Sequence, residues 1–84
     1  MSRKEKLIER LKQRTRDFTW SELERLLNGL AYTESKKGKT GGSRRKFTHA
    51  NAPTIALHRP HPTDILKAYQ VEQVLETLEK AGLI

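Results

Sequence analysis

The sequence contains no cysteine, which excludes a disulfide framework and a thiolate zinc site. Long apolar runs are also missing, and no stretch approaches the roughly 20 apolar residues of a membrane-spanning helix. Residues 1–16 carry scattered charges where a signal peptide would have an apolar segment, so we expect the mature chain to begin at or near Met1. These absences favour a cytoplasmic protein that does not span a membrane.

Acidic residues are scarce relative to basic ones. The 84 residues include 17 Lys and Arg against 10 Asp and Glu, which gives a net charge of +7. In a small chain this balance favours a polyanionic partner, with nucleic acid as the first candidate and a membrane surface as the second. The excess is concentrated in residues 35–48, which hold six Lys or Arg and no acid.

Three segments have the apolar spacing of amphipathic helices. Residues 4–12 predict a short basic helix. Thr19-Trp20-Ser21-Glu22 is a capping box that begins a second helix, for which Gly29 is the predicted C-terminal cap. Residues 69–81 predict a terminal helix that ends at Gly82.

Between the second and third helices the pattern indicates strands. Short strands are predicted at 31–35, 43–49 and 54–57, separated by a Gly- and Lys-rich loop and by the turn at Asn51-Ala52-Pro53. Phe47 is the only large apolar side chain of the middle strand, and we expect it to point inward. Arg59-Pro60-His61-Pro62 predicts a stiff extended loop, because each proline restricts its neighbour.

The predicted order of elements is α-α-β-β-β-α, an α+β fold in which a three-stranded antiparallel sheet packs against two helices. We expect one domain over residues 1–84, with a basic N-terminal helix in 1–16 and the core in 17–84.

The segment from Lys36 to Lys46 combines flexible backbone with six cations, a composition suited to gripping phosphates. The alternative is a plain solvated loop. Gly38-Lys39-Thr40 resembles the end of a nucleotide-binding P-loop, but the required glycine is replaced by Thr33, so we reject that function. No cofactor is expected.

The three histidines are the candidates for acid–base chemistry. His49 follows the basic strand, His58 ends the next strand and His61 lies in the Pro-rich loop, so we expect them to converge at one end of the sheet. A neutral imidazole can take the proton of a ribose 2′-hydroxyl, which is what metal-independent RNA cleavage needs. Exposed turn histidines without a function are the alternative. A metal site is disfavoured, because no ligand-spacing motif is present.

Gly42-Ser43-Arg44-Arg45-Lys46-Phe47-Thr48-His49, the strand ending in His58, and the closing Ala81-Gly82-Leu83 resemble the HicA toxin family. The resemblance covers residues 18–84. It implies a fold like the double-stranded-RNA-binding domain, cleavage of mRNA, and neutralisation by a HicB-type antitoxin. The usual Gly-Ser-His histidine of the family is here Arg44, and the N-terminal helix is an addition to its compact members.

The sequence therefore predicts a toxin that binds and cleaves mRNA. The alternative is a non-catalytic RNA-binding module of the same fold, which the loss of the family histidine favours. A DNA-binding protein that uses a helix in the major groove fits less well, because the two best helices carry net acid. The predicted catalytic residues are His49 and His58, and the predicted RNA-binding residues are Lys37, Lys39, Ser43, Arg44, Arg45, Lys46, Arg59 and His61.

Overall fold

The computed structural model describes residues 3–35 and 44–84. Its elements are, in chain order, α1 (Arg3–Lys12), α2 (Trp20–Gly29), β1 (Thr33–Ser35), β2 (Arg44–Thr48), β3 (Ile55–His58) and α3 (Ala68–Lys80). The predicted order α-α-β-β-β-α is confirmed, and so is the α+β class. The predicted loop at 36–42 lies outside the described residues.

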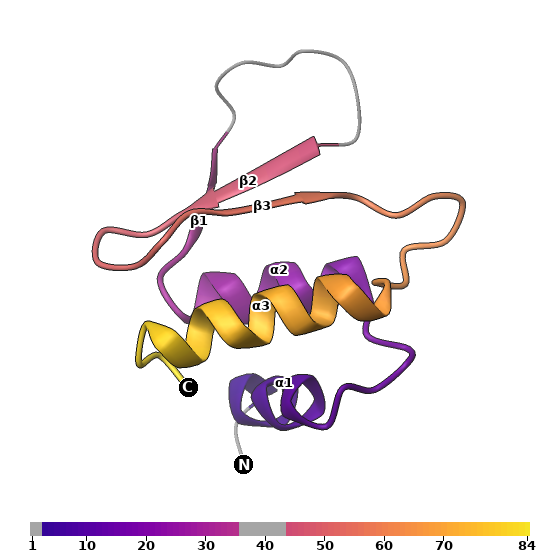
Figure 1. Cartoon of the computed structure of the whole chain (residues 1–84), viewed down its shortest axis with the longest axis horizontal. Helices are drawn as coiled ribbons and strands as arrows, with labels where there is room; N and C mark the ends of the chain where they lie inside the picture. The colour runs from indigo at the N-terminus through magenta and orange to yellow at the C-terminus, as the bar shows by residue number, and fades with distance from the viewer. Residues whose placement is uncertain (1–2, 36–43) are drawn as a thin grey trace.

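The elements form three layers (Figure 1). The sheet has the strand order β1-β2-β3 and both of its pairings are antiparallel. Helices α2 and α3 lie along one face of this sheet, and α1 packs against both of them on the side away from the sheet. In the described part of the chain, no helix covers the opposite face of the sheet. None of the described helices is long and apolar enough to cross a membrane.

The core lies between the sheet and the α2–α3 layer. Trp20 is fully buried and its ring lies 5.8 Å from that of Phe47, which confirms that Phe47 points inward. Full burial of such a side chain is worth roughly 1.5–3 kcal/mol, and an aromatic pair adds to this value. The other buried apolar residues come from all three helices, from β3 and from the loops: Leu11, Phe18, Leu23, Leu26, Leu27, Tyr32, Ile55, Leu57, Leu66, Val71, Val74, Leu75 and Leu78.

The start of α2 has the predicted capping box. The hydroxyl of Thr19 accepts a hydrogen bond from the backbone N–H of Glu22 at 3.2 Å, and the Glu22 carboxylate accepts one from the Thr19 N–H at 3.0 Å. Two N–H groups that the helix itself leaves without partners are thereby satisfied. This cap fixes where α2 begins beneath the sheet.

The helices end differently from one another. Gly82 follows α3 with a left-handed φ of 73°, and the N–H of Leu83 donates to the carbonyl of Leu78 at 3.0 Å, so the predicted glycine ending is confirmed. For α2 the predicted cap is wrong, because the left-handed residue is Ala31, with φ 72°. Gly29 is still helical, and a Cβ there would stand 3.1 Å from Cδ of Lys4. Its small size lets α1 approach α2.

Replacing Ala31 with glycine should stabilise the protein. Holding an L-residue in the left-handed region costs roughly 1–2 kcal/mol, and glycine avoids this strain. Part of the gain is offset because glycine makes the unfolded chain more flexible. We expect Ala31→Gly to raise the free energy of unfolding by about 0.5–1 kcal/mol in urea denaturation. The matched control is Ala81→Gly, because Ala81 caps α3 with a right-handed φ of −79° and gains nothing from the change. Equal effects of the two variants would contradict this account.

Candidate nucleic-acid interface

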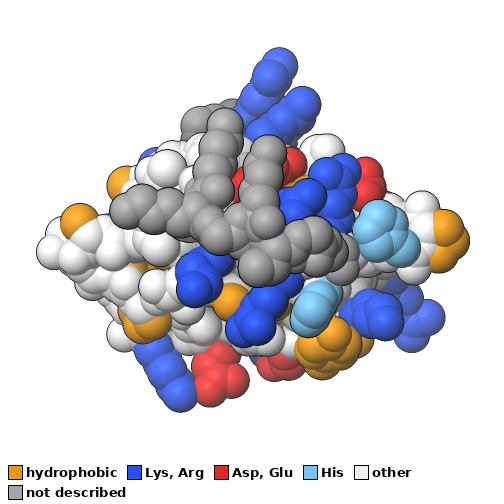
Figure 2. Space-filling view, turned by 90° about the horizontal axis from the view of Figure 1, so that it is seen from above, with side chains coloured by type: hydrophobic (Ala, Val, Ile, Leu, Met, Phe, Trp, Pro, Cys, Tyr) orange, Lys and Arg blue, Asp and Glu red, His pale blue; other side chains and the backbone are white. Residues whose placement is uncertain are grey.

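The sheet presents one face to solvent. Successive side chains of a strand point to opposite faces, so the burial of Phe47 turns Arg44, Lys46 and Thr48 away from the helices. The same alternation on β3 turns His58 outward, because Leu57 is buried. We call this surface the outer strand face; it comprises Thr33, Ser35, Arg44, Lys46, Thr48, Ala56 and His58. Figure 2 looks onto this side of the molecule and shows Lys, Arg and His side chains gathered there.

Strand register places a histidine beside an arginine. Arg44 on β2 pairs directly with His58 on β3, and Lys46 pairs with Ala56. Directly opposite residues of an antiparallel pair have Cβ atoms about 4.5–5.5 Å apart on the same face of the sheet. The side chains of Arg44 and His58 therefore leave the sheet next to each other, with Lys46 two residues along the strand.

Arg45 lies on the other face. Its guanidinium Nε is 3.5 Å from a carboxylate oxygen of Glu34, which pairs with Phe47 in register and therefore shares the inner face. Both side chains are only partly exposed. Of the predicted phosphate-binding residues of β2, the structure thus brings Arg44 and Lys46 to the outer strand face and separates Arg45 from them.

The Pro-rich loop is tied to the beginning of α2. The Trp20 N–H donates to the Asp64 carbonyl at 2.7 Å, and the Leu66 N–H donates to the Phe18 carbonyl at 2.8 Å. The Asp64 carboxylate accepts two hydrogen bonds from the guanidinium of Arg59, at 3.2 and 3.1 Å, and these bonds lower the pKa of Asp64. Arg59 is therefore held beside the end of β3, and His61 is exposed in the same loop.

Gln70 fixes the backbone at His58. It is buried, with 2% of its surface exposed, and its side-chain amide donates to the His58 carbonyl at 2.8 Å. Its amide oxygen accepts from the Lys67 N–H at 3.0 Å. Because both ends of the amide are satisfied, burying it carries little penalty. The amide joins the end of β3 to the start of α3, and the sequence pattern contained no signal for this contact.

His49 lies far from the other two histidines. It follows β2 at the end opposite Arg44, and five residues of strand separate these two positions by about 16 Å. The ring of His49 packs on Tyr32 at 4.9 Å, and its Nδ1 accepts the N–H of Asn51 at 2.9 Å. The expected convergence of all three histidines is therefore wrong. Antiparallel pairing carries His58 back to Arg44 and leaves His49 beside the turn.

Three of the predicted RNA-binding residues, Lys37, Lys39 and Ser43, lie outside the described residues. In the ranges 3–35 and 44–84, no group of three or more His, Cys, Asp or Glu residues is placed to hold a metal ion.

The inner face contains a carboxylate pair whose protonation should affect stability. Burial raises the pKa of Glu24, and the negative charge and hydrogen bond of Glu34 raise it further, while Arg59 and Arg45 oppose this shift. A carboxyl with a raised pKa in the folded chain favours folding when it is protonated. This contribution is fully present below the pKa of the unfolded chain and is lost as the pH rises through the pKa of the folded chain.

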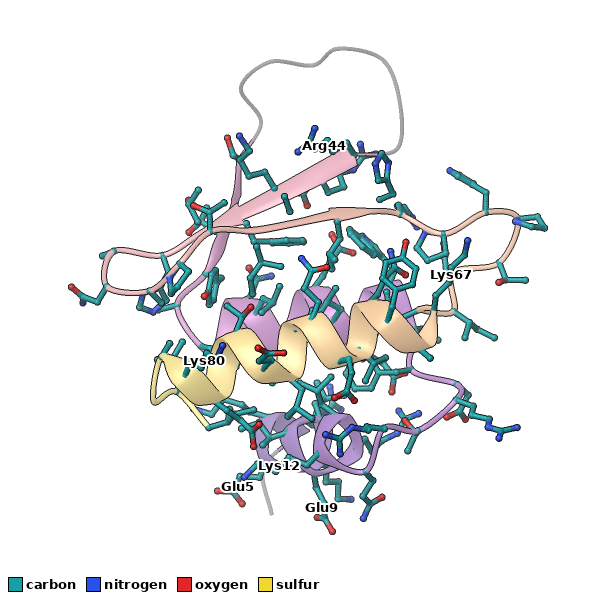
Figure 3. The ribbon with its side chains drawn as sticks, viewed as in Figure 1. Glu5, Glu9, Lys12, Arg44, Lys67 and Lys80 are labelled. Carbon is teal, nitrogen blue, oxygen red and sulfur yellow. The ribbon has the colours of Figure 1, made fainter. Side chains whose placement is uncertain are left out.

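We therefore expect Glu24→Gln to raise the urea midpoint at pH 7, and the advantage to shrink as the pH falls toward about 4. Urea titrations at several pH values measure the effect. Glu9→Gln is the control, because Glu9 is exposed on α1 and points away from the other helices (Figure 3). A Glu24→Gln advantage independent of pH would exclude this role for the carboxylate pair.

One comparison with known proteins identifies a family for this chain. Residues 20–83 match the model of a family described as the HicA toxin of bacterial toxin–antitoxin systems. The match runs from α2 through α3 and leaves α1 outside it. No curated protein and no solved structure matches the chain, so the likeness to the double-stranded-RNA-binding domain stays a prediction. Since the family model covers well over half of the sequence, the chain belongs to the HicA family of toxins of bacterial toxin–antitoxin systems.

Proposed function

We propose that this toxin binds mRNA on the outer strand face and cleaves it, without a metal ion, with His58 as the general base. The observation that carries the proposal is the direct pairing of His58 with Arg44 on the exposed face of the sheet. The cognate partner is a HicB-type antitoxin, the site of action is the cytoplasm, and no small-molecule cofactor takes part.

Arg44 stands where the family resemblance places the histidine of Gly-Ser-His. Because His58 lies directly across the strand pair, its Cβ atom is about 5 Å from that of Arg44. His58, which matches another histidine of the family pattern, is therefore the histidine that the sheet places beside this position. Arg44, which replaces the family histidine, supplies a positive charge that binds the phosphate.

Binding would rest on the cations of the outer strand face. Arg44 and Lys46 contact successive phosphates, and Arg59 and His61 extend the contact beyond the end of β3. Lys37, Lys39 and Ser43, from the segment between β1 and β2, add further phosphate contacts. Cations placed along a strand bind the phosphates of the RNA whatever its base sequence, which suits a toxin that acts on many mRNAs.

For cleavage, the imidazole of His58 takes the proton of a ribose 2′-hydroxyl, and the resulting oxyanion attacks the adjacent phosphorus. The guanidinium of Arg44 stabilises the charge that builds on the phosphoryl oxygens. The bond to the 5′-oxygen then breaks, leaving a 2′,3′-cyclic phosphate. Water, which reaches this exposed face, protonates the departing oxygen.

Removing the two outward cations of β2 should weaken RNA binding. Arg44→Ala with Lys46→Ala should lower the affinity for single-stranded RNA and reduce the slope of log affinity against log salt by about 1.4, because two phosphate contacts are lost. Fluorescence anisotropy over a salt series measures both. Lys12→Ala with Lys80→Ala is the charge-matched control, because both lysines are exposed and lie far from Arg44 (Figure 3). An equal change of slope in the control would show that RNA does not bind specifically to the outer strand face.

Cleavage should depend on His58 and not on His49. We expect His58→Ala to slow cutting of a labelled RNA by about 10²–10⁴-fold in the presence of a chelator, with RNA affinity nearly unchanged. His49→Ala should cut at close to the wild-type rate, although the protein should unfold at lower denaturant because its turn loses the contacts with Tyr32 and Asn51.

Growth arrest on induction, with RNA integrity read in the same cells, extends this test to the living host. If His58→Ala stays fully active, the proton transfer lies elsewhere. If the wild-type protein binds RNA without cutting it, the non-catalytic RNA-binding module is the correct function.

A further inference from the structure

The far side of the molecule carries a second cluster of cations. A groove of about 440 Å³ runs between α1 and α2, and its cationic lining residues are Arg3, Lys4, Lys6, Arg10 and Arg25. Leu7 and Glu22 complete the lining. This groove, which we call the α1–α2 groove, is separated from the outer strand face by the α2–α3 layer (Figure 1).

In the described part of the chain, only one of these five cations forms an ion pair. Arg10 is held by ion pairs to Glu22 and to Asp17, the latter at 2.9 Å. Among the residues that the structure describes, no carboxylate forms an ion pair with Arg3, Lys4, Lys6 or Arg25. Such a concentration of like charge is costly to the folded chain unless an external anion neutralises it.

Two features of the groove favour an acidic peptide over RNA as this anion. Leu7 is half buried in the lining, and the aliphatic stem of Lys4 packs against α2 at Gly29, so the groove offers aliphatic surface between its cations. No aromatic side chain lines the groove. Proteins that hold single-stranded nucleic acid usually stack its bases on aromatic rings, which this groove cannot do.

We propose that the α1–α2 groove binds an acidic segment of the cognate antitoxin, with carboxylates on the rim cations and an aliphatic side chain over Leu7. The family match begins at residue 20, so α1, which supplies most of these cations, lies outside the matched region. The groove therefore adds a contact for the antitoxin that leaves the outer strand face free for other contacts. The proposal rests on the toxin having an antitoxin and is independent of RNA cleavage.

The test uses the full chain and two fluorescent probes: a synthetic peptide of glutamates around a central leucine, and oligo-uridine. We expect Lys6→Ala with Arg25→Ala to weaken peptide binding roughly fivefold, because each helix loses one exposed cation. Lys12→Ala with Lys80→Ala removes the same charge outside the groove and should leave peptide binding nearly unchanged. Circular dichroism checks that each variant is folded, and a peptide with glutamine in place of glutamate should not bind.

Oligo-uridine separates this inference from the proposed function. We expect its affinity to be the same for wild type and for Lys6→Ala with Arg25→Ala, and to fall only when Arg44 and Lys46 are replaced. If the groove variant weakens oligo-uridine binding, the groove is an RNA surface. If both double variants weaken peptide binding equally, the peptide senses net charge alone. Either result, or unchanged peptide binding in the groove variant, would overturn the inference.

Discussion

The packing of Phe47 against Trp20 determines which side chains of β2 face the helices and which face solvent. Because side chains alternate along a strand, one buried aromatic on β2 decides the face of every other residue of that strand. Arg44 and Lys46 are thereby committed to solvent and Arg45 to the inner face, where Glu34 meets it. A shift of β2 by one residue would exchange these roles and bury two cations, so the core and the outer strand face depend on the same contact.

Most of the fold could be predicted from local sequence patterns. The order of elements, the capping box at Thr19 and the inward Phe47 follow from spacing and side-chain chemistry within a few residues, which a sequence displays directly. The ending of α2 did not follow, because Ala31 takes a conformation that normally signals glycine. The nearby Gly29 is instead explained by the close approach of α1. No local sequence pattern indicates such a packing contact between two helices.

The candidate site was harder to predict than the fold, since it depends on which residues face each other across strands. Both His49 and His58 are candidates from the sequence, whereas antiparallel register joins only His58 to Arg44 and places His49 at the far end of β2. The inward turn of Arg45 follows from the burial of Phe47 two residues later, because side chains alternate along a strand. The link from Gln70 to His58 could not be predicted, because it joins two elements through a single amide.

The same glutamine has a consequence for how the sheet meets other chains. β3 is an edge strand, and its free edge would ordinarily accept a further strand from another molecule. The side chains of Gln70 and Gln73 donate to the carbonyls of His58 and Ala56, at 2.8 and 3.4 Å. A strand arriving beside β3 must first break both contacts, so this side of the sheet resists extension into a larger sheet or an aggregate.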